Sequence, residues 1–259
     1  MLKKLPVCNI LDVIAPAINN VWSDTVKINK RIITCMALIC GVFIIGSIGY
    51  KNVLPAGSVS IKESCPVIII DAGHGGFDGG AVANDGTVEK DINLKISLAL
   101  EQFLKQAGYK TVMTRTTDSA TDDVETKVIA ARKKSDLKNR VSLMKEYPNG
   151  IFVSIHLNKF TTSAASGAQV FYSQNSDNSM ELGECIQAQI LSMMQPENKR
   201  VIKKGTSSTY LLKNATIPTV IVECGFLSNK RESELLKNEE YQQKMAFCVF
   251  CGILNYYKE

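Results

Sequence analysis

The sequence predicts an α/β fold, with one membrane-spanning helix before a single globular domain. From Pro66 onward strand and helix signals alternate, which is typical of a twisted, mostly parallel or mixed sheet of about six strands flanked by helices. An uncharged run over residues 32–50 precedes this region. The remaining chain of about 200 residues has an ordinary single-domain size.

Residues 32–50 (IITCMALICGVFIIGSIGY) form the predicted membrane span. Their number is close to the ~20 residues that a helix needs to cross a bilayer. Five basic residues lie before the run and few follow it, so the positive-inside rule places residues 1–31 in the cytoplasm as a short stub. We therefore expect a signal anchor in the cell membrane, a linker over residues 51–65 and a catalytic domain over residues 66–259 on the outer side. A cleaved signal peptide is the alternative, although no clear small-x-small cleavage site follows.

The net charge of +5 belongs mainly to this membrane end of the chain. Five of the 30 basic residues and two of the 25 acidic residues lie in residues 1–50, so the rest carries a surplus of only two. A near-neutral domain lacks the basic surface of a nucleic-acid-binding protein. We therefore expect no nucleic-acid partner.

Hydrophobic periodicity and turn residues place the elements in order. The predicted strands are Val67–Asp71, Lys110–Thr114, Ile151–Ile155, Ala168–Tyr172, Tyr210–Leu212 and Thr219–Val222. The predicted helical regions are Glu89–Ala107, a mostly helical polar stretch from Asp122 to Glu146, Met180–Met194, and one or two helices over Glu232–Tyr257. Gly108 is well placed to end the first helix.

The only two histidines of the chain lie at the ends of buried strands. His74 follows IIIDAG and His156 ends FVSIH, while a third strand, TVIVE, ends in Glu223. Because the carboxyl ends of strands in an open α/β sheet converge on one crevice, we expect these side chains to meet there. Glu89 joins them from the first turn of a helix. Two histidines and one carboxylate are a common ligand set for catalytic Zn²⁺, and Glu223 is then free to act as the general base.

Structural roles are the alternatives for the acidic residues. Glu89 at a helix start also complements the helix dipole, and Glu223 in an apolar strand can be a buried acid paired with a basic residue. We interpret Asp71 as hydrogen-bonding support beside the site, and Asp78 and Asp85 as residues that shape the glycine-rich loop. That loop lacks both the dinucleotide fingerprint and the P-loop motif, so close backbone approach to a metal or a substrate explains its glycines better.

Three segments in order resemble the zinc-dependent N-acetylmuramoyl-L-alanine amidases of bacterial cell-wall turnover, the amidase type 3 family. They are IIIDAGHGGFDGGA with TVEKDINL, then FVSIHLN, then IPTVIVECGFLSN, and the resemblance spans about residues 66–257. It implies peptidoglycan as the substrate, Zn²⁺ held by His74, Glu89 and His156, and Glu223 as the catalytic residue. Ala72 stands where the family often has proline, which we expect to alter loop stiffness and not chemistry.

Two further segments, RKKSDLKNRV (132–141) and SGAQVFY (166–172), are similar to the spore-cortex, germination-specific branch of the family. In that branch the amidase removes stem peptides so that muramic acid can become its lactam, and some clostridial relatives work with an accessory lipoprotein. The resemblance therefore implies a role in spore cortex maturation and a lipoprotein as a candidate partner. Taken alone, the basic residues of 132–140 are typical of a solvated helix face, with contact to anionic glycan or a partner as the alternative.

Two other functions fit parts of the pattern. A zinc peptidase of carboxypeptidase type would need an arginine for the substrate carboxylate, and Arg115 and Arg200 are the candidates. A catalytically silent wall-binding module would not need the metal and catalytic residues, which are all present.

Overall fold

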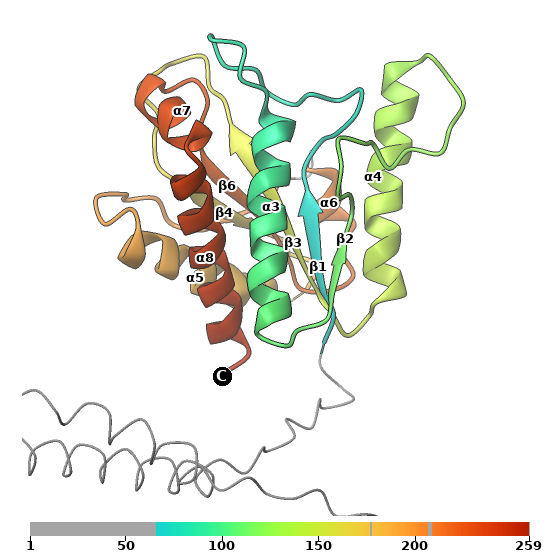
Figure 1. Cartoon of the computed structure of the whole chain (residues 1–259). Coiled ribbons are helices and arrows are strands. Elements are labelled where there is room, and N and C mark those ends of the chain that lie inside the picture. The colour runs from blue at the N-terminus through green and yellow to red at the C-terminus, as the bar shows by residue number, and fades with distance from the viewer. Residues whose placement is uncertain (1–65, 177, 207–208, 259) are drawn as a thin grey trace, which may run out of the picture. The chain divides into compact units, whose positions relative to one another are not determined.

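The computed structural model describes residues 66–176, 178–206 and 209–258, in which a six-stranded sheet lies between two layers of helices (Figure 1). The strand order is β2-β1-β3-β6-β4-β5. The strands are β1 (Ile68–Ala72), β2 (Thr111–Met113), β3 (Ile151–Asn158), β4 (Gln169–Tyr172), β5 (Lys203–Lys204) and β6 (Thr219–Phe226). The pairs among β2, β1, β3 and β6 are parallel, whereas β4 runs antiparallel to β6. The prediction of a mixed sheet of about six strands is confirmed.

Helices cover both faces of this sheet. They are α3 (Glu89–Gln106), α4 (Ile129–Glu146), α5 (Asn178–Met193), α6 (Tyr210–Lys213), α7 (Lys230–Lys237) and α8 (Glu239–Tyr256). Helix α3 packs on β1 and β3, α5 packs on β4 and β6, and α8 packs against both helices. Helices α4 and α6 contact each other and lie against β1 and β6, respectively.

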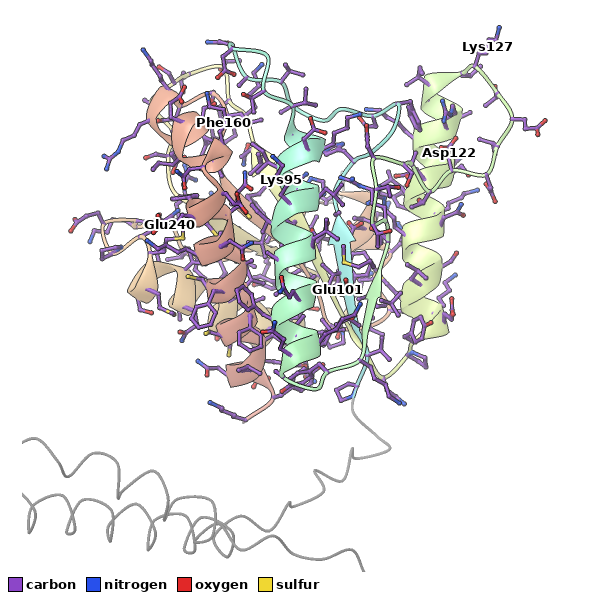
Figure 2. All side chains as sticks on the ribbon, in the orientation of Figure 1. Lys95, Glu101, Asp122, Lys127, Phe160 and Glu240 are labelled. Atoms are coloured by element: carbon purple, nitrogen blue, oxygen red, sulfur yellow. The ribbon has the colours of Figure 1, made fainter. Side chains whose placement is uncertain are left out.

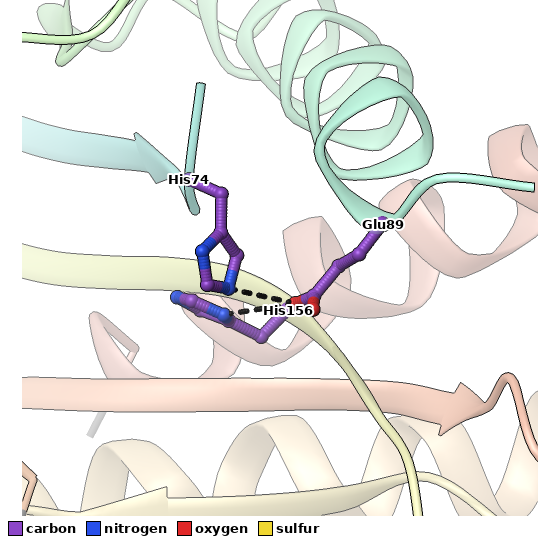
Figure 3. A group of neighbouring side chains, drawn as sticks. All are labelled: His74, Glu89 and His156. Atoms are coloured by element: carbon purple, nitrogen blue, oxygen red, sulfur yellow. Dashed lines mark hydrogen bonds and ion pairs between the residues drawn. The ribbon is translucent and has the colours of Figure 1, made fainter. Parts of the chain in front are cut away.

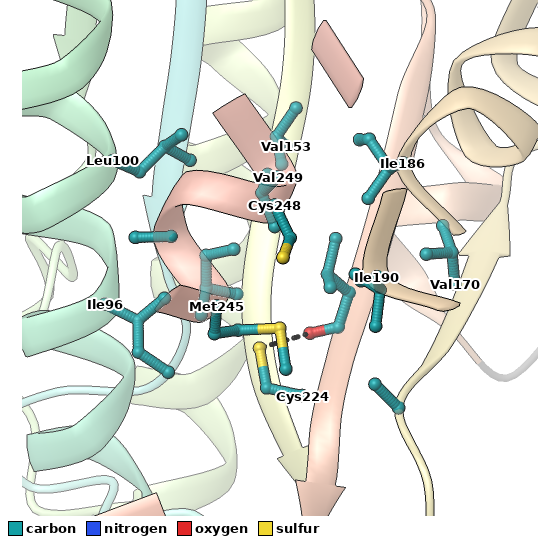
Figure 4. Close-up of a cluster of buried hydrophobic side chains, with 14 of the residues drawn as sticks. Ile96, Leu100, Val153, Val170, Ile186, Ile190, Cys224, Met245, Cys248 and Val249 are labelled. Carbon is teal, nitrogen blue, oxygen red and sulfur yellow. Dashed lines mark hydrogen bonds between the residues drawn. The ribbon is translucent and has the colours of Figure 1, made fainter. Parts of the chain in front are cut away.

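The alternation of side chains along the strands separates two hydrophobic cores. In β1, Ile68 and Ile70 belong to the larger core under α3, α5 and α8, whereas Ile69 belongs to the smaller core under α4 and α6. Figure 4 shows the larger core, in which α3, α5 and α8 bring apolar side chains onto β3 and β4. A fully buried side chain of this size contributes about 1.5–3 kcal/mol relative to an exposed one. These two cores fix the strands whose ends carry the site.

The predicted strand Tyr210–Leu212 is wrong, because the structure has a short helix there, Tyr210–Lys213. Leu211 and Leu212 are both buried. A run of three apolar residues is too short for its periodicity to separate strand from helix. The two-residue strand β5 gave no sequence signal for the same reason.

The polar stretch predicted as mostly helical begins its helix only at Ile129. Side chains of the preceding segment bind back onto α4 instead, since Asp122 pairs with Arg132 and Asp123 accepts from the hydroxyl of Ser135. At the C-terminus the structure has two helices, because Asn238 ends α7 and caps α8 by accepting from the backbone N–H of Tyr241.

Within the part of the chain that the structure describes, no helix combines the length and the apolar character that crossing a membrane requires. The predicted anchor over residues 32–50 and the linker over 51–65 lie outside the described residues.

Candidate metal and catalytic site

Three neighbouring strands end at the site. Strand β1 leads into the loop that carries His74, and β3 and β6 place His156 and Glu223 opposite each other in register. Glu89 comes from the first residue of α3, after the glycine-rich loop. The structure therefore brings the two histidines and Glu89 together at the carboxyl edge of the sheet, as predicted (Figure 3).

The side chains of His74, Glu89 and His156 form a compact group of possible metal ligands. Oε1 of Glu89 lies 3.3 Å from Nε2 of His74 and 3.1 Å from Nδ1 of His156. One candidate ligand atom from each residue lies within 4.8 Å of the other two. Two imidazoles and one carboxylate are a donor set of catalytic zinc sites, so the residues present fit this ion.

The carboxylate of Glu89 is held from several sides. It is almost completely buried, and it accepts hydrogen bonds from the backbone N–H groups of Ala81 (2.7 Å) and Leu157 (3.0 Å). The amide of Asn93, one turn further along α3, donates to it at 3.2 Å. These contacts exceed what a residue that only complements the helix dipole would need.

His74 adopts an unusual backbone conformation. Its φ of 62° lies in the left-handed region, which residues other than glycine rarely occupy. The imidazole Nδ1 donates to Oδ2 of Asp78 at 2.9 Å, which turns Nε2 toward Glu89. Asp78 also accepts from the backbone N–H of Gly80 and exchanges backbone hydrogen bonds with Gly75, so the interpretation that it shapes the loop is confirmed, and it orients a possible metal ligand as well. Asp85 accepts from the backbone N–H of Thr87 within the loop at 3.0 Å, as its interpretation requires, and also forms an ion pair with Lys237 on α7.

Two glycines of the loop lie where a side chain would fill the site. A methyl group on Gly73 would lie 2.4 Å from Nε2 of His156. A methyl group on Gly80 would lie 2.6 Å from Oε2 of Glu89, and the φ of Gly80 is +71°. Close backbone approach to the site thus accounts for both glycines, as the sequence indicated.

The site holds strongly perturbed charges. Burial opposes the charged form of His74, but hydrogen bonds to Asp78 and Glu89 outweigh it and raise its pKa to about 9. Burial also opposes ionisation of Glu89, but its hydrogen bonds to His156 and His74 hold its pKa well below the usual range. The metal-free site thus combines an ionised carboxylate with a protonated imidazole, whose proton a metal ion must displace.

Glu223 completes the site from β6. Its Oε2 atom is buried and has no hydrogen-bond partner among the described residues. The alternative, a buried acid paired with a basic residue, is therefore not observed in this part of the chain. Burial raises the pKa of Glu223 to about 7, although the nearby His156 favours the ionised form. A carboxyl group with such a pKa can accept and return a proton near neutral pH.

Comparison with known proteins decides the family. Residues 68–255 match the family model described as N-acetylmuramoyl-L-alanine amidase. The chain belongs to this amidase family. A Bacillus subtilis relative, the germination-specific N-acetylmuramoyl-L-alanine amidase, is 34% identical over 200 residues, which are 77% of this chain and 83% of the relative. Among solved structures, the CwlD amidase from Clostridioides difficile in complex with the GerS lipoprotein is 42% identical, with a TM-score of 0.72 over 74% of this chain and 98% of that chain.

A buried ion pair supports the loop between β1 and α3, residues 73–88, which carries the possible ligand His74 and is named the metal loop. Asp71 is fully buried, forms an ion pair with Arg140 and accepts from the hydroxyl of Thr114 at 2.8 Å. Burial opposes ionisation of Asp71, but Arg140 outweighs it and lowers its pKa. Asp71 is outside the group of possible ligands, so its interpretation as support is confirmed.

The interpretation of residues 132–140 as a solvated helix face is wrong for two of its charged residues. Arg140 is only 2% exposed and Asp136 is also buried, and the two form an ion pair. The sequence held a signal for this, because Asp136, Arg140 and Met144 follow at spacings of four and so share a stripe with an apolar residue.

The two arginines considered for a peptidase have other partners. Arg115 is buried, and its guanidinium donates to the backbone carbonyls of Ala72 and Gly73 at 2.8 and 3.0 Å. Arg200 donates to the carbonyl of Ser166 at 2.7 Å. Arg115 therefore supports the metal loop and is not available to a substrate carboxylate, which removes one basis for the carboxypeptidase alternative.

Proposed function

We propose that this chain is a zinc-dependent N-acetylmuramoyl-L-alanine amidase that hydrolyses the amide between the lactyl group of muramic acid and L-alanine. The observation that carries the proposal is the convergence of His74, Glu89 and His156 next to Glu223, in a member of the amidase family. The substrate is the stem-peptide linkage of peptidoglycan.

His74, Glu89 and His156 hold the metal. Zinc in this position would polarise the amide carbonyl and lower the pKa of a water molecule. Asp78 keeps the proton of His74 on Nδ1, so that Nε2 is free for the metal. The backbone amides on Glu89 hold its carboxylate in one orientation.

Glu223 is the general base and then the general acid. Its buried carboxylate accepts a proton from the attacking water and returns it to the nitrogen of L-alanine as the amide breaks. Its raised pKa of about 7 suits both steps, because neither protonation state is strongly favoured at neutral pH.

The enzyme acts outside the cell membrane during spore cortex maturation, where stem-peptide removal precedes formation of muramic lactam and permits germination. The germination-specific name of the Bacillus subtilis relative supports this role. Residues 32–50 anchor the chain as a single-pass span, with the catalytic domain on the outer side. The solved CwlD amidase in complex with the GerS lipoprotein supports an accessory lipoprotein as a partner.

Mass spectrometry of peptidoglycan fragments tests the proposal. We expect the purified chain with zinc to release free stem peptides that begin with L-alanine, and the Glu223→Gln variant to release them at least about a hundredfold more slowly. Shortened stem peptides that are still attached to muramic acid would instead indicate a carboxypeptidase-type enzyme. Binding to peptidoglycan without any cleavage would indicate a silent wall-binding module.

A further inference from the structure

Helix α4 contacts the metal loop through a charged side chain that the proposed reaction does not use. Nζ of Lys133 lies 2.8 Å from Oδ1 of Asp78, and the other oxygen of this carboxylate accepts from Nδ1 of His74 at 2.9 Å. Lys133 is thus joined to a metal ligand through one side chain. The Asp78 carboxylate has both oxygens engaged and therefore one preferred orientation.

Two other basic residues of α4 contact the same loop. The guanidinium of Arg132 lies 3.9 Å above the centre of the Phe77 ring. Asp122, which Figure 2 shows on the segment before α4, forms an ion pair with this guanidinium and so fixes its position. Nη2 of Arg140 donates to the backbone carbonyl of His74 at 2.8 Å. The basic face of α4, defined here as Arg132, Lys133 and Arg140, therefore contacts the loop at three of its residues.

The loop needs such support because of its conformation. His74 is the only described residue other than glycine with a positive φ, and this conformation is unfavourable for a side chain with Cβ. It persists only where contacts over-determine it. The side chain must also point Nε2 at Glu89, and the Asp78 hydrogen bond is the contact that sets this direction.

We infer that Lys133 is a positioning residue of the metal site, which raises zinc affinity by fixing Asp78 and, through Asp78, the ring of His74. This inference rests on the proposed function, since it takes zinc as the ion. Loss of a direct partner of a metal ligand lowers affinity by about 10- to 100-fold. Lys133 acts through one further side chain and is half exposed, so its loss is expected to lower zinc affinity by about tenfold, the lower end of that range.

The alternative is an ordinary surface ion pair. Side chains as exposed as Lys133 commonly form pairs that contribute little to stability, and such a pair would leave the metal site unchanged. The neighbouring Lys134 provides a matched control, because it is exposed on the same turn and has no ion pair among the described residues.

The test measures the zinc dissociation constant of the full-length protein by competition with a chromophoric chelator. Lys133→Met is expected to bind zinc about tenfold more weakly than the wild type, while Lys134→Met binds as the wild type does. Lys133→Arg keeps a cation near Asp78 and is expected to restore most of the affinity. Thermal unfolding of the metal-free proteins should give the same midpoint for all three variants.

A double-mutant cycle shows whether the effect passes through Asp78. In an Asp78→Asn background, Lys133→Met is expected to cause no further loss of zinc affinity, because the carboxylate that transmits the effect is gone. Equal zinc affinity of Lys133→Met and Lys134→Met overturns the inference, and so do additive effects in the cycle. A wild type that binds no zinc and cleaves no peptidoglycan contradicts the proposed function itself, which separates the two failures.

Discussion

Glu223 shares one site with the possible metal ligands His74, Glu89 and His156, but substitutions in the two are expected to impair different properties of the protein. Glu223→Gln keeps the size of the side chain and removes the proton acceptor, so we expect kcat on a muropeptide to fall by about 10²- to 10⁴-fold. The zinc dissociation constant should stay near that of the wild type, since Glu223 is outside the group of possible ligands.

His74→Ala is the matching variant, because it removes a proposed ligand and should lose both zinc and turnover. Wild-type turnover by purified Glu223→Gln, measured on the same muropeptide, would falsify the role given to this residue.

The protonation of His74 makes zinc binding depend on pH. The metal-free imidazole has a pKa of about 9, above its ordinary value of 6.5, and zinc requires the neutral form. Below about 9, zinc must therefore displace a proton, and the apparent affinity should rise about tenfold for each pH unit up to that value. Competition titrations in a series of buffers measure this dependence.

Asp78→Asn is the control for the cause of this shift. Removing a carboxylate that raises the pKa of His74 lowers this pKa, so the pH above which affinity stops rising should move down. An affinity of the wild type that is flat between neutral pH and about 9 would contradict the assignment of the proton to His74.

Among the structural elements, the loop between β1 and α3 matters because its backbone lies directly against the possible metal ligands Glu89 and His74. Gly80→Ala is expected to abolish tight zinc binding, since the new methyl group would lie 2.6 Å from Oε2 of Glu89 and 2.7 Å from Cδ2 of His74. Gly86→Ala tests the backbone alone, because Gly86 also has a positive φ of +88° but nothing within 4 Å of its would-be side chain.

Gly86→Ala should therefore cost about 1–2 kcal/mol of folding free energy and leave zinc affinity unchanged. Chelator competition and chemical unfolding of both variants measure the two quantities. Similar zinc affinities for the two variants would mean that Gly80 is needed for its backbone conformation and not for its close contact with Glu89 and His74.

Local patterns were sufficient to place the strand ends that carry the site. Continuous apolar runs predicted β1, β3 and β6, and polar residues at their ends predicted where His74, His156 and Glu223 would meet. Contacts between residues far apart in the sequence have no local pattern that would predict them. Arg140 lies 69 residues from Asp71, and nothing near either residue shows that they form an ion pair.

The order and direction of the strands also depend on contacts between residues far apart in the sequence. The alternation of strands and helices predicted a mostly parallel or mixed sheet, but not which strand is reversed. The antiparallel direction of β4 depends on its register with β6, where Gln169 lies opposite Glu223. No residue of β4 by itself indicates that direction. The sequence therefore predicted a sheet and its functional edge, while the position of β4 beside Glu223 came from the structure.

At the scale of the whole molecule, the helical layer behind the site depends on close contact between α5 and α8. A methyl group on Gly252 of α8 would lie 2.5 Å from Cα of Ile186 on α5. Gly252→Ala must therefore push the two helices apart, which we expect to cost about 1–3 kcal/mol of folding free energy. A domain of this size should then unfold a few degrees lower, as measured by calorimetry of the metal-free protein.

Two further variants separate backbone contact from side-chain crowding. Ile186→Ala should not rescue Gly252→Ala, because the nearest atoms include Cα and the backbone nitrogen of Ile186, which trimming leaves in place. Gly183→Ala on α5 should be tolerated, since its methyl group would meet Val170 at an ordinary 3.5 Å and alanine favours helix. Rescue by Ile186→Ala would show that α5 and α8 are separated by side chains, and that the layer can adjust without moving the strands that carry the site.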